Sequence, residues 1–138
     1  MALDPNRWTL KTQEAFQAAV DSARQHANPE VTPDHLLVAL LGQAESVVLP
    51  ILQKVGKNPV SLRNEADNAI AKLPSAYGGE SRMAKALTDL MDEADKARVE
   101  LTDEYLSTEH LLLAMADKVR VAREDLLAAL RAVRARHP

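Results

Sequence analysis

Two short stretches of this 138-residue chain place an acid and a histidine ahead of an apolar run. The first runs from Thr32 to His35 (Thr-Pro-Asp-His), and the second runs from Ser107 to His110 (Ser-Thr-Glu-His). Acids and histidines are the groups that general acid–base catalysis and metal sites use. Neighbours on a helix point about 100° apart, however, so Asp34 cannot orient His35 within one helix. We therefore expect both histidines to pack, partly buried, at the start of a helix.

The same two stretches carry the pattern of a helix start. Thr32 and Ser107 are N-cap candidates, and Pro33 falls at the first helical position, where its missing N–H costs nothing. Asp34 and Glu109 place negative charge at the positive end of the helix dipole. A motif that occurs twice predicts a duplicated unit, with one buried central helix in each half.

The acids at the two helix starts have a second interpretation. If the repeat symmetry brings both starts to one surface, Asp34 and Glu109 form an acid pair that could recognise a cationic group on a peptide. Asp103, in the loop just before the second start, would add a third carboxylate. The simpler interpretation, that these acids only complement helix dipoles, stays open beside it.

Apolar residues around the second half suggest a groove. The helix expected over about 82–101 carries more large apolar side chains than one narrow stripe needs. By default these side chains, Met91 among them, are expected in the core. The alternative is that Met91 lines a groove between the halves, because flexible methionine suits varied apolar partners. Trp8 and Tyr105 flank Thr9 and the second helix start, and they are candidates for the groove in the same way as Met91.

Composition narrows the function further. The net charge of −3 argues against nucleic acid or an anionic membrane as the main partner. No cysteine is present, so no disulfide framework or thiolate metal site is expected, which fits a cytoplasmic protein. None of the four glycines lies in a G-x-x-x-x-G-K-Ser/Thr loop, so we expect this chain to bind no ATP or other cofactor and not to be an enzyme.

The helical pattern predicts an all-α domain of seven or eight short helices in two pseudo-repeats of about four helices, the second one shortened. We expect the first repeat over about 9–74, a linker over about 75–82, and the second repeat over about 83–136. Thr9 and Ser81 are the expected caps of the first helix of each repeat, and Gly42 is expected to end the central helix in the left-handed conformation. Equivalent positions of the two repeats lie 74 residues apart in the first helices and 75 residues apart in the central helices. This difference predicts one extra residue in the second repeat. The basic end is expected to be a solvated helix terminus, formed by Arg131, Arg134, Arg136 and His137.

These features resemble the Clp N-terminal domain family. The resemblance covers essentially the whole chain, and its most specific part is the doubled Ser/Thr-x-Asp/Glu-His-Leu-Leu motif. Within the family the chain looks most like the domains of ClpB-type disaggregases. That likeness is carried by Leu3-Asp4, Arg7-Trp8-Thr9, the 63–73 stretch that leads into Pro74, and the 103–107 stretch.

The resemblance implies a substrate-recognition domain. Such domains precede ATP-binding AAA+ modules in a hexameric cytoplasmic chaperone, engage unfolded or aggregated protein and help to pass it to the pore. The isolated domain is expected to be a monomer. The residues that handle substrate in the ClpB type are matched here by Thr9, Asp103 and Glu109, beside the apolar groove.

Two other functions remain as alternatives. The related ClpC-type N-domains bind adaptors and phosphoarginine-tagged proteins through acids at both helix starts, which Asp34 and Glu109 match here. A hydrolase built on the acid–histidine pairs is the third hypothesis.

Overall fold

The computed structural model describes residues 3–76 and 78–136, so Tyr77 of the expected linker and His137 of the expected basic end lie outside the described residues. Within the described part the chain is all-α apart from one short 3-10 helix, η1 (Pro5–Arg7), and two strands of two residues each. The α-helices are α1 (Leu10–Gln25), α2 (Pro33–Leu41), α3 (Val48–Lys54), α4 (Pro59–Ala71), α5 (Lys85–Glu100), α6 (Thr108–Ala114), α7 (Ala116–Val119) and α8 (Arg123–Arg136).

The two repeats align at a constant spacing through their first two helices. The bounds of α1 and α5 differ by 75 at both ends, and the N-caps of α2 and α6, Thr32 and Ser107, also differ by 75. The expected extra residue in the second repeat is therefore wrong. Adjacent positions on a helix face can both be apolar, so apolar matching alone could not distinguish an offset of 74 from one of 75.

The turns after α1 and α5 are also equivalent. Ala27 and Thr102 both have positive φ, 54° and 56°. The next residue in each turn, Asn28 or Asp103, donates its backbone N–H to the helix, at 2.9 Å to Ala23 O and at 3.0 Å to Arg98 O. These bonds satisfy carbonyls that a helix end leaves free, which fixes where the following loop begins.

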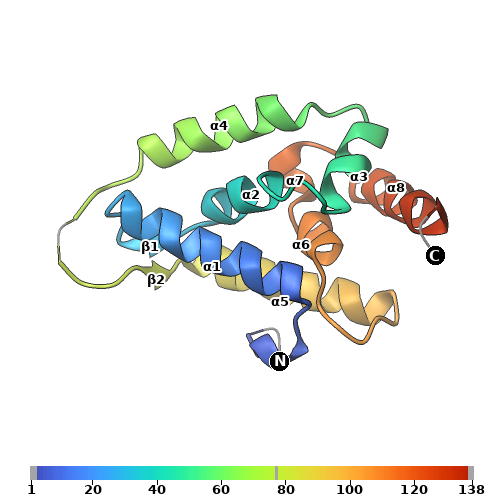
Figure 1. Ribbon diagram of the computed structural model, residues 1–138, viewed down its shortest axis with the longest axis horizontal. Helices are drawn as coiled ribbons and strands as arrows, with labels where there is room; N and C mark the ends of the chain where they lie inside the picture. Colours follow the sequence, from blue (N-terminus) through green and yellow to red (C-terminus); the bar gives the residue numbers. More distant parts are fainter. Residues whose placement is uncertain (1–2, 77, 137–138) are drawn as a thin grey trace.

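Short parallel strand pairs cross-connect the two repeats. β1 (Glu30–Val31), which precedes α2, pairs with β2 (Arg82–Met83), which precedes α5. The second pair is a single bridge between Trp8, ahead of α1, and Leu106, ahead of α6. Figure 1 shows β1 and β2 side by side, at the same end of the molecule as the end of α4. In both pairs, a segment that precedes a helix of one repeat is hydrogen-bonded to a segment that precedes a helix of the other.

The core is aliphatic, as the low aromatic content requires. Trp8 is 6% exposed and packs on Phe16 with ring centroids 5.1 Å apart. α4 packs on α2, whereas α8 packs mainly on α3 and α6. The four-residue α7 replaces the longer α3 of the first repeat, which confirms the expected shortening. The largest side chains with almost no exposure include Leu36, Leu40, Ile51, Leu52, Leu111, Leu112, Met115 and Leu126.

Two expected helix boundaries are wrong in detail. Ser81 does not cap α5, because 82–83 form β2 and the helix begins after Ala84; the Ser81 hydroxyl instead donates to Asn28 O at 2.6 Å. Gly42 ends α2 with right-handed angles (φ −85°, ψ −5°), and a Cβ there would meet its neighbours only at ordinary contact distance. Gly56, with φ +80°, does end α3 in the left-handed conformation.

Candidate functional site

Both motif histidines are structural. The side chains of His35 and His110 are fully buried, and each closes the start of its own helix. Nδ1 accepts from the backbone N–H of Thr32 or Ser107, at 2.8 Å in both repeats. Because that N–H can only donate, Nδ1 carries no proton, and Nε2 is the donor of a neutral ring. Burial and, to a lesser extent, the charge of His26 lower the pKa of His35, against the opposing effect of Asp34.

The acceptor of Nε2 differs between the repeats. His35 donates to Asn28 Oδ1 at 2.9 Å, and His110 donates to Asp103 Oδ2 at 2.7 Å. Ser107 Oγ lies 3.0 Å from His110 Nδ1, so the second repeat aligns serine, histidine and aspartate. The alignment does not make a nucleophile, because the ring is fully buried and its Nδ1 is already held by a backbone N–H. Thr32, His35 and Asn28 repeat the geometry without any acid at the third position.

Asp103 and Glu109 are brought together by Arg134, which sequence analysis had placed in a solvated basic end. The guanidinium contacts Asp103 Oδ2 at 2.8 Å and Glu109 Oε2 at 3.0 Å. Burial alone would raise the pKa of Asp103, but hydrogen bonds from Arg134 and His110 outweigh it, so that the pKa lies below its ordinary value. One signal could have identified Arg134: at the offset of 64 that relates α8 to α4, it replaces the buried Ile70.

The acid of the first repeat has a different partner. Asp34 Oδ1 lies 2.7 Å from Lys118 Nζ, and Lys118 belongs to α7 of the second repeat. Asp34 and Glu109 therefore each hold an internal cation, from α7 and α8 respectively.

Thr9 lies where the N-terminal segment meets the loop before α6. Its Oγ1 accepts from the Thr12 N–H at 3.2 Å and caps α1, and its own N–H donates to Leu106 O at 3.0 Å. The Thr12 hydroxyl donates to the same Leu106 O, so the Thr9 hydroxyl must donate to Thr12 Oγ1, at 2.9 Å. Leu10 and Tyr105 flank this junction and are 69% and 47% exposed. We call Thr9, Leu10 and Tyr105 the apolar edge.

Two other predicted groove residues lie in the core. Met91 has no exposed surface, and Trp8 is nearly as buried and packs on Phe16. Met91 shares the inner face of α5 with Leu87, Leu90 and Ala94, since residues three, four and seven apart lie on one side of a helix. In this conformation neither side chain is available to a ligand.

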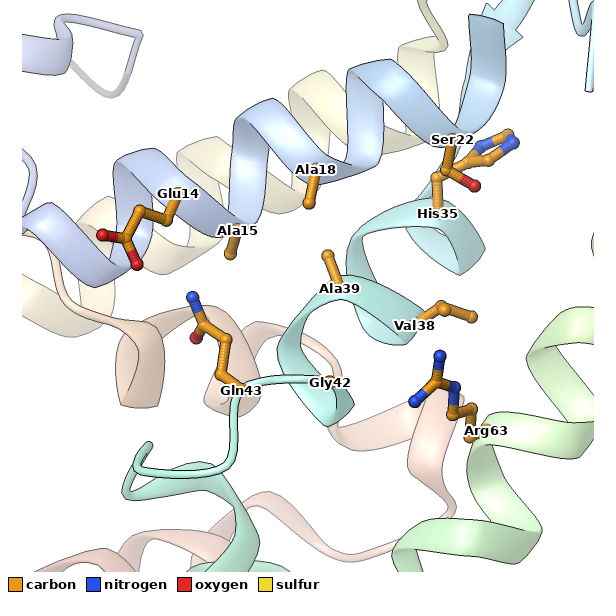
Figure 2. Close-up of a pocket in the computed structure, with 10 residues that line it drawn as sticks. All are labelled: Glu14, Ala15, Ala18, Ser22, His35, Val38, Ala39, Gly42, Gln43 and Arg63. Atoms are coloured by element: carbon orange, nitrogen blue, oxygen red, sulfur yellow. The ribbon is translucent and has the colours of Figure 1, made fainter. Parts of the chain in front are cut away.

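A separate pocket of about 370 Å³ lies between α1, α2 and α4. Figure 2 shows Ala15, Ala18 and Ala39 facing its interior, with Glu14 and Arg63 far apart at its margins. Gln43 donates to Lys11 O at 2.9 Å, and its buried Oε1 has no hydrogen-bond partner among the residues that the structure describes. None of the predicted substrate residues lines this pocket.

Neither a metal site nor a membrane span was found in the described part of the chain. Over residues 3–76 and 78–136 no three histidine or acidic side chains are grouped so that they could hold a metal ion. The helices of this same part lack the combination of length and hydrophobicity that crossing a bilayer requires.

Comparison with known proteins gives a consistent result. Residues 7–130 match the family described as the Clp repeat N-terminal domain. The chaperone protein ClpB of Corynebacterium diphtheriae is 40% identical over 121 residues, which cover 86% of this chain and only 14% of that relative's length.

Solved structures share the fold. The N-terminal domain of the ClpV1 ATPase from enteroaggregative E. coli superposes with a TM-score of 0.82 at 18% identity, covering 94% of this chain and 87% of that one. A ClpV N-domain in complex with a VipB peptide superposes with a TM-score of 0.68 at 22% identity, covering 93% and 79%. On the evidence of the family match and of its 40% identity to a ClpB relative, this chain belongs to the Clp repeat N-terminal domain family.

Proposed function

We propose that this chain is the substrate-recognition domain of a ClpB-type disaggregase, and that it engages unfolded or aggregated polypeptide for delivery to an ATPase pore. The observation that carries the proposal is the apolar edge. Leu10 and Tyr105 expose large apolar surfaces on two segments that are joined by the Thr9–Leu106 hydrogen bond. Peptide binding by a ClpV N-domain of the same fold supports this use of the scaffold.

Unfolded segments differ from folded proteins chiefly in the apolar side chains that they expose. Covering Leu10 and Tyr105 with such a segment removes apolar surface from water on both sides, at roughly 25 cal/mol per Å². The area offered is small, so we expect binding in the micromolar range or weaker. Several linked domains in a hexamer would raise the effective affinity without any new contact.

The same proposal covers the rest of the protein. ATP would bind to AAA+ modules in other parts of the longer chain, and those modules would assemble into a cytoplasmic hexamer. The isolated domain would be a monomer with no cofactor of its own.

A two-dimensional NMR titration with a permanently unfolded protein, such as reduced and carboxymethylated lactalbumin, tests the proposal. We expect shifts at Thr9, Leu10 and 103–106. Leu10→Ser combined with Tyr105→Ser should weaken binding about tenfold or more, because two apolar contacts are lost. Val60→Ser is the matched control, since Val60 is 67% exposed but lies on α4. Equal losses in the control and the double variant would contradict the proposal.

A ClpC-type docking function is the second candidate. One observation favours it: the acids of both helix starts, Asp34 and Glu109, each hold a cation. Phosphoarginine or an adaptor would have to displace Lys118 or Arg134. If this candidate is correct, Lys118→Ala should increase phosphoarginine affinity and Asp34→Ala should abolish it, in a salt-dependent manner. An absence of shifts near either acid in wild type and in Lys118→Ala would exclude it.

A further inference from the structure

Arg134 joins two acids that come from different segments. It projects from the end of α8, and its fork meets Asp103 in the α5–α6 loop and Glu109 in the first turn of α6. Nη1 and Nη2 contact the two oxygens of Asp103 at 3.3 and 2.8 Å, while Nε and Nη2 contact Glu109 Oε2 at 3.1 and 3.0 Å. Bidentate pairing of this kind holds geometry as well as charge. We call Arg134, Asp103 and Glu109 the arginine clamp.

Asp103 and Glu109 already accept hydrogen bonds from within the domain. Asp103 Oδ2 accepts from His110 Nε2 as well as from Arg134. The side chain of Glu109 is 11% exposed, and that of Asp103 is 27% exposed. A polypeptide that approaches this surface therefore meets two carboxylates of which three oxygens, Asp103 Oδ1 and Oδ2 and Glu109 Oε2, already accept charge-assisted hydrogen bonds.

The first repeat has no such clamp. Asn28 takes the place of Asp103, and its Nδ2 donates to Pro74 O at 3.1 Å. The buried Ile70 takes the place of Arg134 in α4. The clamp thus belongs only to the repeat that carries the α5–α6 loop, and this loop supplies Tyr105.

The loop that the clamp holds is also the one that forms the apolar edge. Leu106, three residues after Asp103, donates its N–H to Arg7 O at 2.8 Å and accepts from the Thr9 N–H at 3.0 Å. Tyr105 lies in sequence between Asp103, which Arg134 holds, and Leu106, which Arg7 and Thr9 hold. Fixing Asp103 consequently fixes the position from which Tyr105 is presented beside Thr9 and Leu10.

We infer that Arg134 is a positioning residue for the substrate-binding surface. It holds the α5–α6 loop in place. Asp103 and Glu109 affect substrate binding by holding Arg134, and they do not contact the substrate themselves. The part of the inference that concerns substrate depends on the proposed function; the part that concerns the loop does not. Two experiments separate them.

The first experiment measures amide hydrogen exchange in the α5–α6 loop. Arg134→Ala should speed exchange at the Leu106 N–H by about tenfold or more, relative to core amides such as that of Leu112, because charge-assisted hydrogen bonds are lost. Arg136→Ala removes the same charge from the exposed end of α8 and should leave this exchange unchanged. If Arg134→Ala does not fold, Arg134→Lys keeps the charge without the fork and should give a smaller increase. Unchanged Leu106 exchange in a folded Arg134 variant overturns the inference.

The second experiment is a double-mutant cycle on binding of the unfolded protein. Glu109→Gln and Arg134→Ala should each weaken binding by a similar factor, and the double variant should bind no worse than either one. Losses that multiply would mean that Glu109 contacts substrate directly, which overturns the inference. Failure of the wild-type domain to bind would overturn the proposed function instead, and the exchange experiment would then decide whether Arg134 positions the loop.

Discussion

Asn28 and Asp103 occupy equivalent positions in the two repeats, and each accepts a hydrogen bond from Nε2 of a buried histidine, at 2.9 and 2.7 Å. The two side chains differ in their other hydrogen bonds. The Asn28 amide nitrogen donates to Pro74 O, whereas both carboxylate oxygens of Asp103 accept from Arg134. One position thus anchors the inter-repeat loop with a donor, and the other anchors α8 with an acceptor.

Exchanging these two residues should destabilise the fold at both sites. Asn28→Asp would place a carboxylate oxygen against the carbonyl of Pro74, and Asp103→Asn would place amide protons against the Arg134 guanidinium. Each variant should lower the free energy of unfolding by about 1–3 kcal/mol, the usual cost of an unsatisfied buried polar group. Urea unfolding measures this directly. A variant as stable as wild type would show that the amide and carboxylate are interchangeable there.

Thr102 should be a site where stability can be gained. It is a β-branched residue with φ +56°, a conformation that glycine adopts without strain. Thr102→Gly should raise the free energy of unfolding by about 1 kcal/mol. Ala27→Gly is the matched substitution in the first repeat, where the residue is smaller, and its gain should be lower. A loss of stability in Thr102→Gly would mean that its hydroxyl bond to Leu101 O, at 2.6 Å, outweighs the strain.

Lowering the pH should reduce the free energy of unfolding, because His35 is buried in its neutral form. Because the pKa of His35 is lowered in the folded state, the unfolded chain takes up a proton first as the pH falls below the ordinary value of 6.5. The free energy of unfolding should therefore be fully present above pH 6.5 and decline below it, by at most about 1.4 kcal/mol per pH unit. Urea titrations at several pH values, from about 8 down to about 5, measure how steeply the free energy of unfolding changes with pH. His35→Gln should flatten it, and an unchanged slope would assign the effect to other groups.

Thr9 should matter first as a cap. Thr9→Ala removes the oxygen that accepts from the Thr12 N–H and the hydroxyl that donates to Thr12, so stability should fall by about 1 kcal/mol. Thr9→Ser keeps both bonds and should be close to wild type in thermal unfolding. If Thr9→Ser retains stability yet binds unfolded protein less well, the methyl group contacts substrate. If both variants are equally unstable, the hydroxyl does not cap α1.

Met91 should behave as a core residue. Its side chain is fully buried, so Met91→Ser creates a cavity and adds a polar group, and stability should fall by about 2–5 kcal/mol. Met91→Leu, which nearly conserves volume, should cost less than about 1.5 kcal/mol and leave binding of unfolded protein intact. Lost binding in a stably folded Met91→Leu domain would instead support a groove that opens to expose Met91.

Local signals predicted the helices well and the site less well. Capping residues such as Thr9, Thr32, Asn58 and Ser107 act on their own helix, so the chain near each one is enough to locate the start. Strands of two residues have no periodicity, which is why β2 and the later start of α5 could not be predicted from the sequence. The helical spacing of Met91 with Leu87, Leu90 and Ala94 did predict a core position as the simpler alternative to a groove.

Arg134 was missed for a related reason. An arginine near a helix end is usually solvated, and nothing local to it indicates that two acids about 25–31 residues earlier lie within reach. Only a comparison of the two repeats, position by position, sets it apart from Ile70.

The crossed strand pairs make the repeats interdependent. The Thr12 hydroxyl bonds to a carbonyl 94 residues away in sequence, and the segments ahead of α1, α2, α5 and α6 pair across the two halves. Stacked repeat proteins can add or lose units and unfold stepwise, because each unit contacts only its neighbours. This duplicated chain should instead melt in a single transition. A backbone cut at Gly78–Gly79 should leave two fragments that stay associated and that are each unstructured when alone.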